Sequence, residues 1–148
     1  MKFRVFLVIC FLVSFNVAAA EIEVYKSPTC GCCQKWVDAL KSDGHDVVIH
    51  HMNDLQSIKQ KAGLPFELGS CHTGFVEGYV LEGHVPLQEI NKLLEEKPSI
   101  KGLAVPGMPA ESLGMEVGRT PSPYTVYSFD NMDRITSVAE YKGSEKIK

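Results

Sequence analysis

The sequence contains no cluster of lysine and arginine residues and no apolar run long enough to span a membrane. Its 148 residues include 15 Lys+Arg and 18 Asp+Glu, which gives a formal net charge of −3 at pH 7. A protein that binds nucleic acid needs a basic surface to offset the phosphates, so we expect no nucleic-acid partner. The longest apolar run, Val5–Val13, has nine residues, whereas a spanning helix needs roughly 20. We therefore expect no stable membrane insertion.

Residues 1–20 have the pattern of a secretory signal peptide. Lys2 and Arg4 precede the apolar run, and small residues fill 18–20 just before Glu21. A signal peptidase cleaves after small residues in this position. We predict a signal peptide over 1–20, cleaved after Ala20, a single domain over 21–148, and a periplasmic location. The alternative is an uncleaved N-terminal membrane anchor, which the short apolar run disfavours.

Cysteine is scarce, and its distribution is uneven. The chain has five cysteines, and three of them fall within Cys30-Gly31-Cys32-Cys33. This crowding does not suit a framework of structural disulfides. Such a bridge stabilises most when it closes a long loop, and only Cys71 offers one. In an exported protein, the remaining roles for clustered cysteines are redox chemistry and the ligation of a soft metal.

Alternating strand and helix patterns predict an α/β domain. We expect strands at 22–26 and 46–51, two short strands within 75–83, and a C-terminal hairpin of 124–129 and 135–141. Helices are expected from 33 to about 42, from 53 or 54 to 63, and from 86 onward, with a loop over 98–123. This order is that of a thioredoxin-like (glutaredoxin-like) domain with an extra C-terminal loop and β-hairpin. In such a domain the first two strands are parallel, which leaves the loop with the cysteines at the carboxyl edge of the sheet.

The cysteine motif supports two chemistries. Cys30 and Cys33 form a C-x-x-C pair with Cys32 inserted, and a helix that begins there favours the thiolate form. A thiolate is both the nucleophile of disulfide exchange and the soft ligand that Cu(I) prefers. In glutaredoxin-like domains a proline faces this pair from the turn before the hairpin. If Thr73 to Tyr79 align with that hairpin, Cys71 and His72 lie on the turn. They would convert a redox pocket into a metal pocket. Alternatively, Cys71 could form a structural disulfide with Cys30, Cys32 or Cys33.

Methionine and histidine supply further candidate ligands. Met108 and Met115 lie in the Pro/Gly-rich loop, where a thioether can bind Cu(I) without losing a proton. The alternative is a methionine that fills a gap beneath the loop. His72 and His84 are also candidates, against the alternative of a surface or hydrogen-bonded imidazole. We interpret His45 as a surface turn residue.

Several segments resemble the CopG-type periplasmic copper-resistance proteins, and the resemblance covers nearly all of 21–148. They are Thr29-Cys30-Gly31-Cys32-Cys33 with Trp36, Ser70-Cys71-His72-Thr73, Gly78-Tyr79, Glu82-Gly83-His84-Val85-Pro86, Gly102-Leu103-Ala104-Val105-Pro106-Gly107-Met108-Pro109 and Gly114-Met115-Glu116. The resemblance implies a thioredoxin-like, copper-binding protein with the C-x-C-C cysteines at its metal site. One departure is at 111–115, which has longer side chains than the small-residue and proline run of that family.

We therefore predict an exported copper-binding protein for copper resistance or homeostasis. Several Cu(I) ions would be held by thiolates of Cys30, Cys32, Cys33 and Cys71, and zinc is the competing metal. The bound copper could also change between Cu(I) and Cu(II). Two alternatives are a periplasmic thiol:disulfide oxidoreductase that uses Cys30 and Cys33, and a copper chaperone to an exporter or periplasmic carrier. A third and a fourth thiol favour metal, because a dithiol enzyme needs only two.

Overall fold

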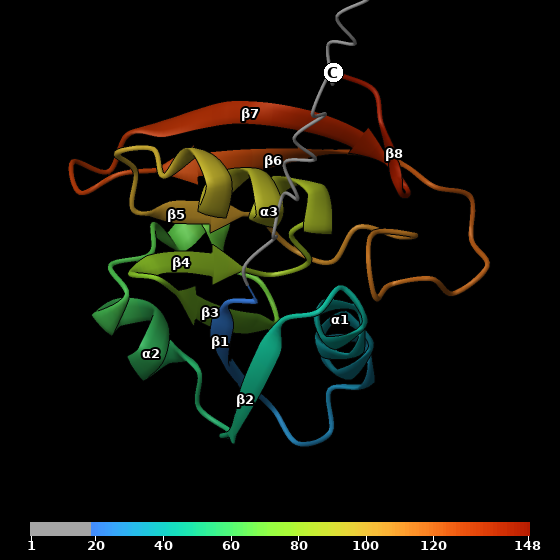
Figure 1. Ribbon diagram of the computed structural model, residues 1–148. Helices are drawn as coiled ribbons and strands as arrows, with labels where there is room; N and C mark the ends of the chain where they lie inside the picture. Colours follow the sequence, from blue (N-terminus) through green and yellow to red (C-terminus); the bar gives the residue numbers. More distant parts are fainter. Residues whose placement is uncertain (1–18) are drawn as a thin grey trace, which may run out of the picture.

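The computed structural model describes residues 19–148, which form one mixed sheet covered by helices (Figure 1). Within this range the sheet has eight strands in the order β2-β1-β3-β4-β5-β6-β7-β8. Most of the predicted signal peptide lies outside the described residues. The elements are β1 (Glu21–Lys26), α1 (Gly31–Ser42), β2 (Asp46–His51), α2 (Gln56–Lys61), a 3-10 turn (Phe66–Leu68), β3 (His72–Val76), β4 (Tyr79–Glu82), α3 (Leu87–Glu96), β5 (Gly102–Ala104), β6 (Pro123–Phe129), β7 (Ile135–Lys142) and β8 (Glu145–Lys146).

The first two strands are parallel, as predicted, and α1 connects them. Alternate residues of β1, including Ile22 and Val24, are buried, as is one face of α1 that carries Trp36 and Leu40. Burial of each such side chain stabilises the fold by about 1.5–3 kcal/mol. Because α1 follows β1 directly, the loop 27–30 lies at the carboxyl end of the strand, and the helix begins at Gly31.

The hairpin of β3 and β4 places a second segment beside that loop. β3 is antiparallel to both β1 and β4, and His72 is the register partner of Lys26 at the end of β1. The turn residues Glu77 and Gly78 both have positive φ, 45° and 85°, which is the pattern of a type I′ hairpin turn. The strand begins at His72, so Cys71 immediately precedes it.

Helices cover both faces of the sheet. Side chains of α1 and α3 share a core cluster with Leu81, whereas the segment that ends α2 and the 3-10 turn share a second cluster with Val80. Adjacent residues of a strand point to opposite faces, so the two clusters lie on opposite sides of β4. The mixed α/β class is therefore confirmed, while the thioredoxin-like assignment stays a prediction.

The C-terminal half differs from the prediction in two places. The expected hairpin is present as β6 and β7, but the predicted loop 98–123 contains a strand, β5, parallel to β4. A Cβ atom on Gly102 would lie 2.1 Å from the carbonyl oxygen of Val80, so only glycine permits this close pairing. A further short strand, β8, follows β7.

The interpretation of His45 as a surface residue is wrong. His45 is 4% exposed, and its Nε2 lies 3.1 Å from Oδ1 of Asn91 on α3. The side chain thus joins the end of α1 to α3. Among the described residues, no helix is both long and apolar enough to cross a membrane.

Candidate metal centre

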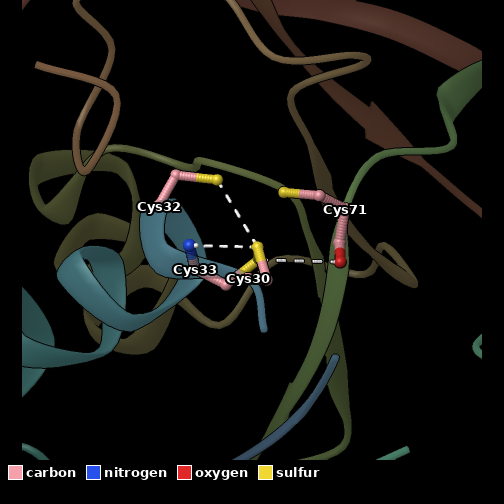
Figure 2. Close-up of side chains that lie close together, drawn as sticks. All are labelled: Cys30, Cys32, Cys33 and Cys71. Carbon is pink, nitrogen blue, oxygen red and sulfur yellow. Dashed lines mark hydrogen bonds between the residues drawn. A yellow bond between two sulfur atoms is a disulfide. The ribbon is translucent and has the colours of Figure 1, made fainter. Parts of the chain in front are cut away.

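Four cysteine sulfurs meet where α1 begins and β3 starts. The Sγ atoms of Cys30, Cys32, Cys33 and Cys71 all lie within 4.8 Å of one another (Figure 2). The first three come from the loop and first turn of α1, and Cys71 reaches them because β3 pairs with β1. The structure therefore brings together the four cysteines that the sequence predicts to share a site.

Two of the four cysteines are joined. Cys30 and Cys33 form a disulfide, whereas Cys32 and Cys71 are free thiols. The backbone N–H of Cys33 donates to Sγ of Cys30, 3.3 Å away, and this sulfur lies 3.4 Å from Sγ of Cys32. Cys33 is fully buried. In this structure, then, the alternative of a structural disulfide to Cys71 is not adopted.

Cys71 also contacts two imidazoles. Its Sγ lies 3.3 Å from Nδ1 of His72 and 3.1 Å from Nε2 of His84. The Nδ1 of His84 is 2.7 Å from the carbonyl oxygen of Leu113. A carbonyl only accepts, so Nδ1–H of His84 donates to it, and the Nε2 lone pair of the neutral ring faces the Cys71 thiol. Cys71, His72 and His84 thus form a second group with the spacing of metal ligands.

Burial sets the protonation of this second group. Burial lowers the pKa of His72, and repulsion from His84, when that ring is protonated, and from Lys59 lowers it further. Burial also lowers the pKa of His84. Both rings are therefore neutral at pH 7, which is the form that binds metal. Burial raises the pKa of Cys71 to about 12, and the neighbouring Cys32 adds to the effect. A metal that binds Cys71 must therefore displace a proton.

Solved structures of the same architecture exist. Two of them, titled copper resistance protein copG form 2 and form 1, are each 39% identical to this chain, with a TM-score of 0.79. The matches cover 84% and 85% of this chain and 99% and 100% of the solved chains. This chain belongs to the CopG family of copper resistance proteins. The predicted resemblance is therefore confirmed.

One family model also matches this CopG protein. It is described as "Protein of unknown function, DUF411" and covers residues 68–115, the segment that contains Cys71 and His84. No curated protein matches the chain.

Both candidate methionines of this CopG protein lie on the loop between β5 and β6. Met108 is 57% exposed, so the alternative in which it fills a gap beneath the loop is wrong. Its neighbour Gly107 forms a bridge with Ser70, next to Cys71. Met115 is partly exposed. It follows Gly114, where a Cβ atom would lie 2.9 Å from the carbonyl oxygen of Cys32. The loop therefore borders the cysteine cluster on two sides.

A buried ion pair behind the cluster was not predicted. Glu82 is fully buried and forms an ion pair with Lys59 on α2. Its carboxylate also accepts hydrogen bonds from the backbone N–H of Ser70, at 2.6 Å, and from the hydroxyl of Thr73, at 2.7 Å. These two residues flank Cys71 and His72, so the Glu82 carboxylate fixes the turn that carries them. The only signal in the sequence was a glutamate at the end of an otherwise apolar strand.

Proposed function

We propose that this protein binds copper, as Cu(I) ions held by thiolates of Cys30, Cys32, Cys33 and Cys71. The observation that carries the proposal is the convergence of all four sulfurs within 4.8 Å. Thiolate and thioether sulfur are soft ligands that suit Cu(I). The CopG structures that this chain resembles are named for copper resistance, and we propose the same role here.

The disulfide makes copper binding depend on redox state. A disulfide sulfur is not a thiolate, so the form with the Cys30–Cys33 bridge offers two cysteine ligands, Cys32 and Cys71, beside His72 and His84. Reduction of the bridge takes two electrons and two protons and yields four thiols. Four thiolates can bridge several Cu(I) ions, so we propose that the reduced protein holds more than one.

Zinc is the competing metal, because cysteine and histidine are also its ligands. Most of the candidate ligand atoms at this site are sulfur, including those of Met108 and Met115 on the bordering loop. Sulfur ligands favour Cu(I) over zinc. We propose that both methionines, together with His72 and His84, complete the copper sites.

A second candidate function is thiol:disulfide exchange. The specific observation in its favour is the Cys30–Cys33 disulfide at the N-terminus of α1, where the Cys33 N–H donates to Cys30. The same hydrogen bond and the helix dipole would stabilise a Cys30 thiolate after reduction. Cys30, Cys32 and Cys71 are partly exposed, which would also permit transfer of copper to a carrier or exporter.

Location and fold type belong to the same proposal. The n-region, apolar run and small residues of 1–20 support export to the periplasm with cleavage before Glu21, and mass spectrometry of the exported protein tests this. The strand order β2-β1-β3-β4, with a parallel first pair and an antiparallel hairpin, supports a thioredoxin-like unit that β5–β8 extend.

Anaerobic titration tests the copper proposal. Protein reduced with a phosphine and protein that carries the Cys30–Cys33 disulfide are titrated with Cu(I) against bicinchoninate, and bound copper is measured by atomic emission. We expect more copper in the reduced form, and displacement of zinc by Cu(I) when the reduced form is loaded with zinc first. Equal copper in both forms, or zinc that survives excess Cu(I), would contradict the proposal.

A further inference from the structure

The four clustered sulfurs comprise one disulfide and one pair of free thiols. Cys30 and Cys33 are bonded, and Cys32 and Cys71 are free. Figure 2 shows the side chains of Cys32 and Cys71 with their sulfurs turned toward each other. All four Sγ atoms lie within 4.8 Å of one another, so a local shift of the chain would bring Cys32 and Cys71 to bonding distance.

We propose that this protein moves its disulfide internally, from Cys30–Cys33 to Cys32–Cys71. The reaction is an intramolecular disulfide exchange that needs no metal and no external oxidant. It goes beyond copper binding, and it can be tested in copper-free protein.

The first step is attack by Cys32 on Cys30. Their sulfurs are already 3.4 Å apart, and the attacking species is the thiolate of Cys32. The Cys30–Cys32 bond forms as the Cys30–Cys33 bond breaks, and the electron pair leaves with the sulfur of Cys33. Gly31 separates the two cysteines, and apart from its chain neighbours and the backbone of α1 nothing lies within 4 Å of the place where its Cβ would be. The backbone between them is therefore free to adjust as the sulfurs close to bonding distance, about 2.05 Å.

The second step is attack by the thiolate of Cys71 on Cys32. This form is present in only a small fraction of molecules at neutral pH, because burial raises the pKa of the Cys71 thiol. The Cys32–Cys71 bond forms, the Cys30–Cys32 bond breaks, and Cys30 leaves as a thiolate. The four clustered cysteines hold one disulfide and two thiols before and after the two steps. The protons lost from Cys32 and Cys71 are replaced on Cys33 and Cys30, so atoms, electrons and charge balance.

The surroundings of Cys71 favour movement of α1 rather than of the turn. Ser70 is held from two sides, because its N–H donates to Glu82 and its hydroxyl donates to the carbonyl oxygen of Gly107. Cys32 lies in the first turn of α1, where backbone N–H groups have no partner within the helix. The first turn of α1 is therefore the part that rearranges to bring Cys32 onto Cys71.

The two forms present different thiols. With the bond at Cys30–Cys33, Cys71 stays free beside His72 and His84. With the bond at Cys32–Cys71, that group loses its sulfur ligand and the Cys30–Cys33 dithiol is released. The position of one disulfide thus decides which thiols an oxidised molecule offers to a metal or a partner.

Tryptic mass mapping distinguishes the two bonds. Cleavage after Lys26 and Lys35 releases one peptide, 27–35, with three cysteines, and Cys71 lies in a separate peptide, 62–92. Copper-free protein is oxidised with glutathione disulfide, quenched in acid and alkylated with maleimide. Monomers that contain a single disulfide are then digested; over residues 21–148 these carry two adducts in the wild-type protein and one adduct in Cys32→Ser. A bond between Cys30 and Cys33 stays within one peptide, whereas a bond to Cys71 joins the two.

We expect the joined peptide 27–35/62–92 in wild-type monomer and its loss in Cys32→Ser. The variant keeps Cys30 and Cys33, so the bond within 27–35 reports that its fold still brings them together. Only the bond within 27–35 in wild-type protein would overturn the proposal. A joined peptide that persists in Cys32→Ser would overturn it as well, because Cys71 would then pair with another cysteine. Since copper is absent throughout, failure of the copper proposal would leave this result unchanged.

Discussion

The imidazole of His84 lies with its Nε2 3.1 Å from Sγ of Cys71. The ring is oriented by its other nitrogen, which donates to the carbonyl oxygen of Leu113 on the loop between β5 and β6. A residue after β4 and a loop far along the chain therefore jointly aim a nitrogen lone pair at the cysteine cluster. This orientation is the one that a metal bound by Cys71 would need.

Replacement of His84 by glutamine tests its role as a ligand. Loss of a nitrogen ligand should weaken Cu(I) binding by about tenfold or more, measured by competition with bicinchoninate, while the Cys30–Cys33 disulfide still forms. His50→Gln is the matched control, because His50 lies on β2, is 41% exposed and pairs with Glu23. Equal losses in both variants would show that His84 does not act at the site.

Glu82→Gln should destabilise the fold. The change leaves the Lys59 ammonium, whose side chain is 13% exposed, without its anionic partner, and breaking a buried pair costs about 3–5 kcal/mol. Urea denaturation measures the loss, and Glu82→Gln combined with Lys59→Met should recover part of it. The control is Glu96→Gln, which removes the exposed partner of Lys92 and should change stability by less than about 0.5 kcal/mol. Similar effects in both single variants would contradict the role given to the buried pair.

Gly114→Ala should displace the loop that carries Met115. Gly114 has a φ of +83°, and an added Cβ would lie 2.8 Å from the backbone nitrogen of Trp36. Gly118→Ala is the matched control, because Gly118 has a φ of +74° with nothing within 4 Å. Both changes incur left-handed strain of about 1–2 kcal/mol, but only Gly114→Ala should also speed alkylation of Cys32. Unchanged Cys32 reactivity would show that the loop does not close over α1.

Acid should loosen the loop segment 117–119. The backbone N–H groups of Arg119 and Val117 donate to Glu111 and lower the pKa of its carboxyl group. A lowered pKa in the folded state means that the carboxylate stabilises the fold at pH above the ordinary glutamate pKa. That contribution is lost as the pH falls through the lowered value. Amide hydrogen exchange at 117–119 should therefore rise, relative to its intrinsic rate, as the pH falls below the ordinary glutamate pKa and through the lowered value, and Glu111→Gln should lack this pH dependence. A wild-type protein with the same pH profile as the variant would refute the assignment.

Local patterns were sufficient to predict which elements form the first half of the fold, but not all of their bounds, because α2 spans only Gln56–Lys61 and β3 begins at His72. The alternating burial in β1 and the apolar face of α1 follow from the short-range spacing of apolar residues, which the sequence shows directly. The approach of Cys71 to Cys30 was also predicted, but from the order of elements in a thioredoxin-like domain rather than from a local pattern.

Long-range pairings were not predictable in the same way. β5 has three residues, too few for a periodic pattern, and it exists because Gly102 permits close contact with β4. The burial of His45 depends on Asn91 of α3, and that of Glu82 depends on Lys59 of α2. No local signal links such partners, since a polar or charged residue considered alone is expected to be exposed.

Copper measured in fully reduced wild-type protein and in Cys71→Ser, under anaerobic conditions, tests the central claim most directly. Cys71 is the one cysteine of the cluster outside the α1 motif, so its loss removes a thiolate without touching the Cys30–Cys33 pair. The copper account predicts a sharp fall in Cu(I) bound per molecule, with reduction of insulin by the remaining dithiol unchanged. Copper content equal to that of wild-type protein would contradict the account.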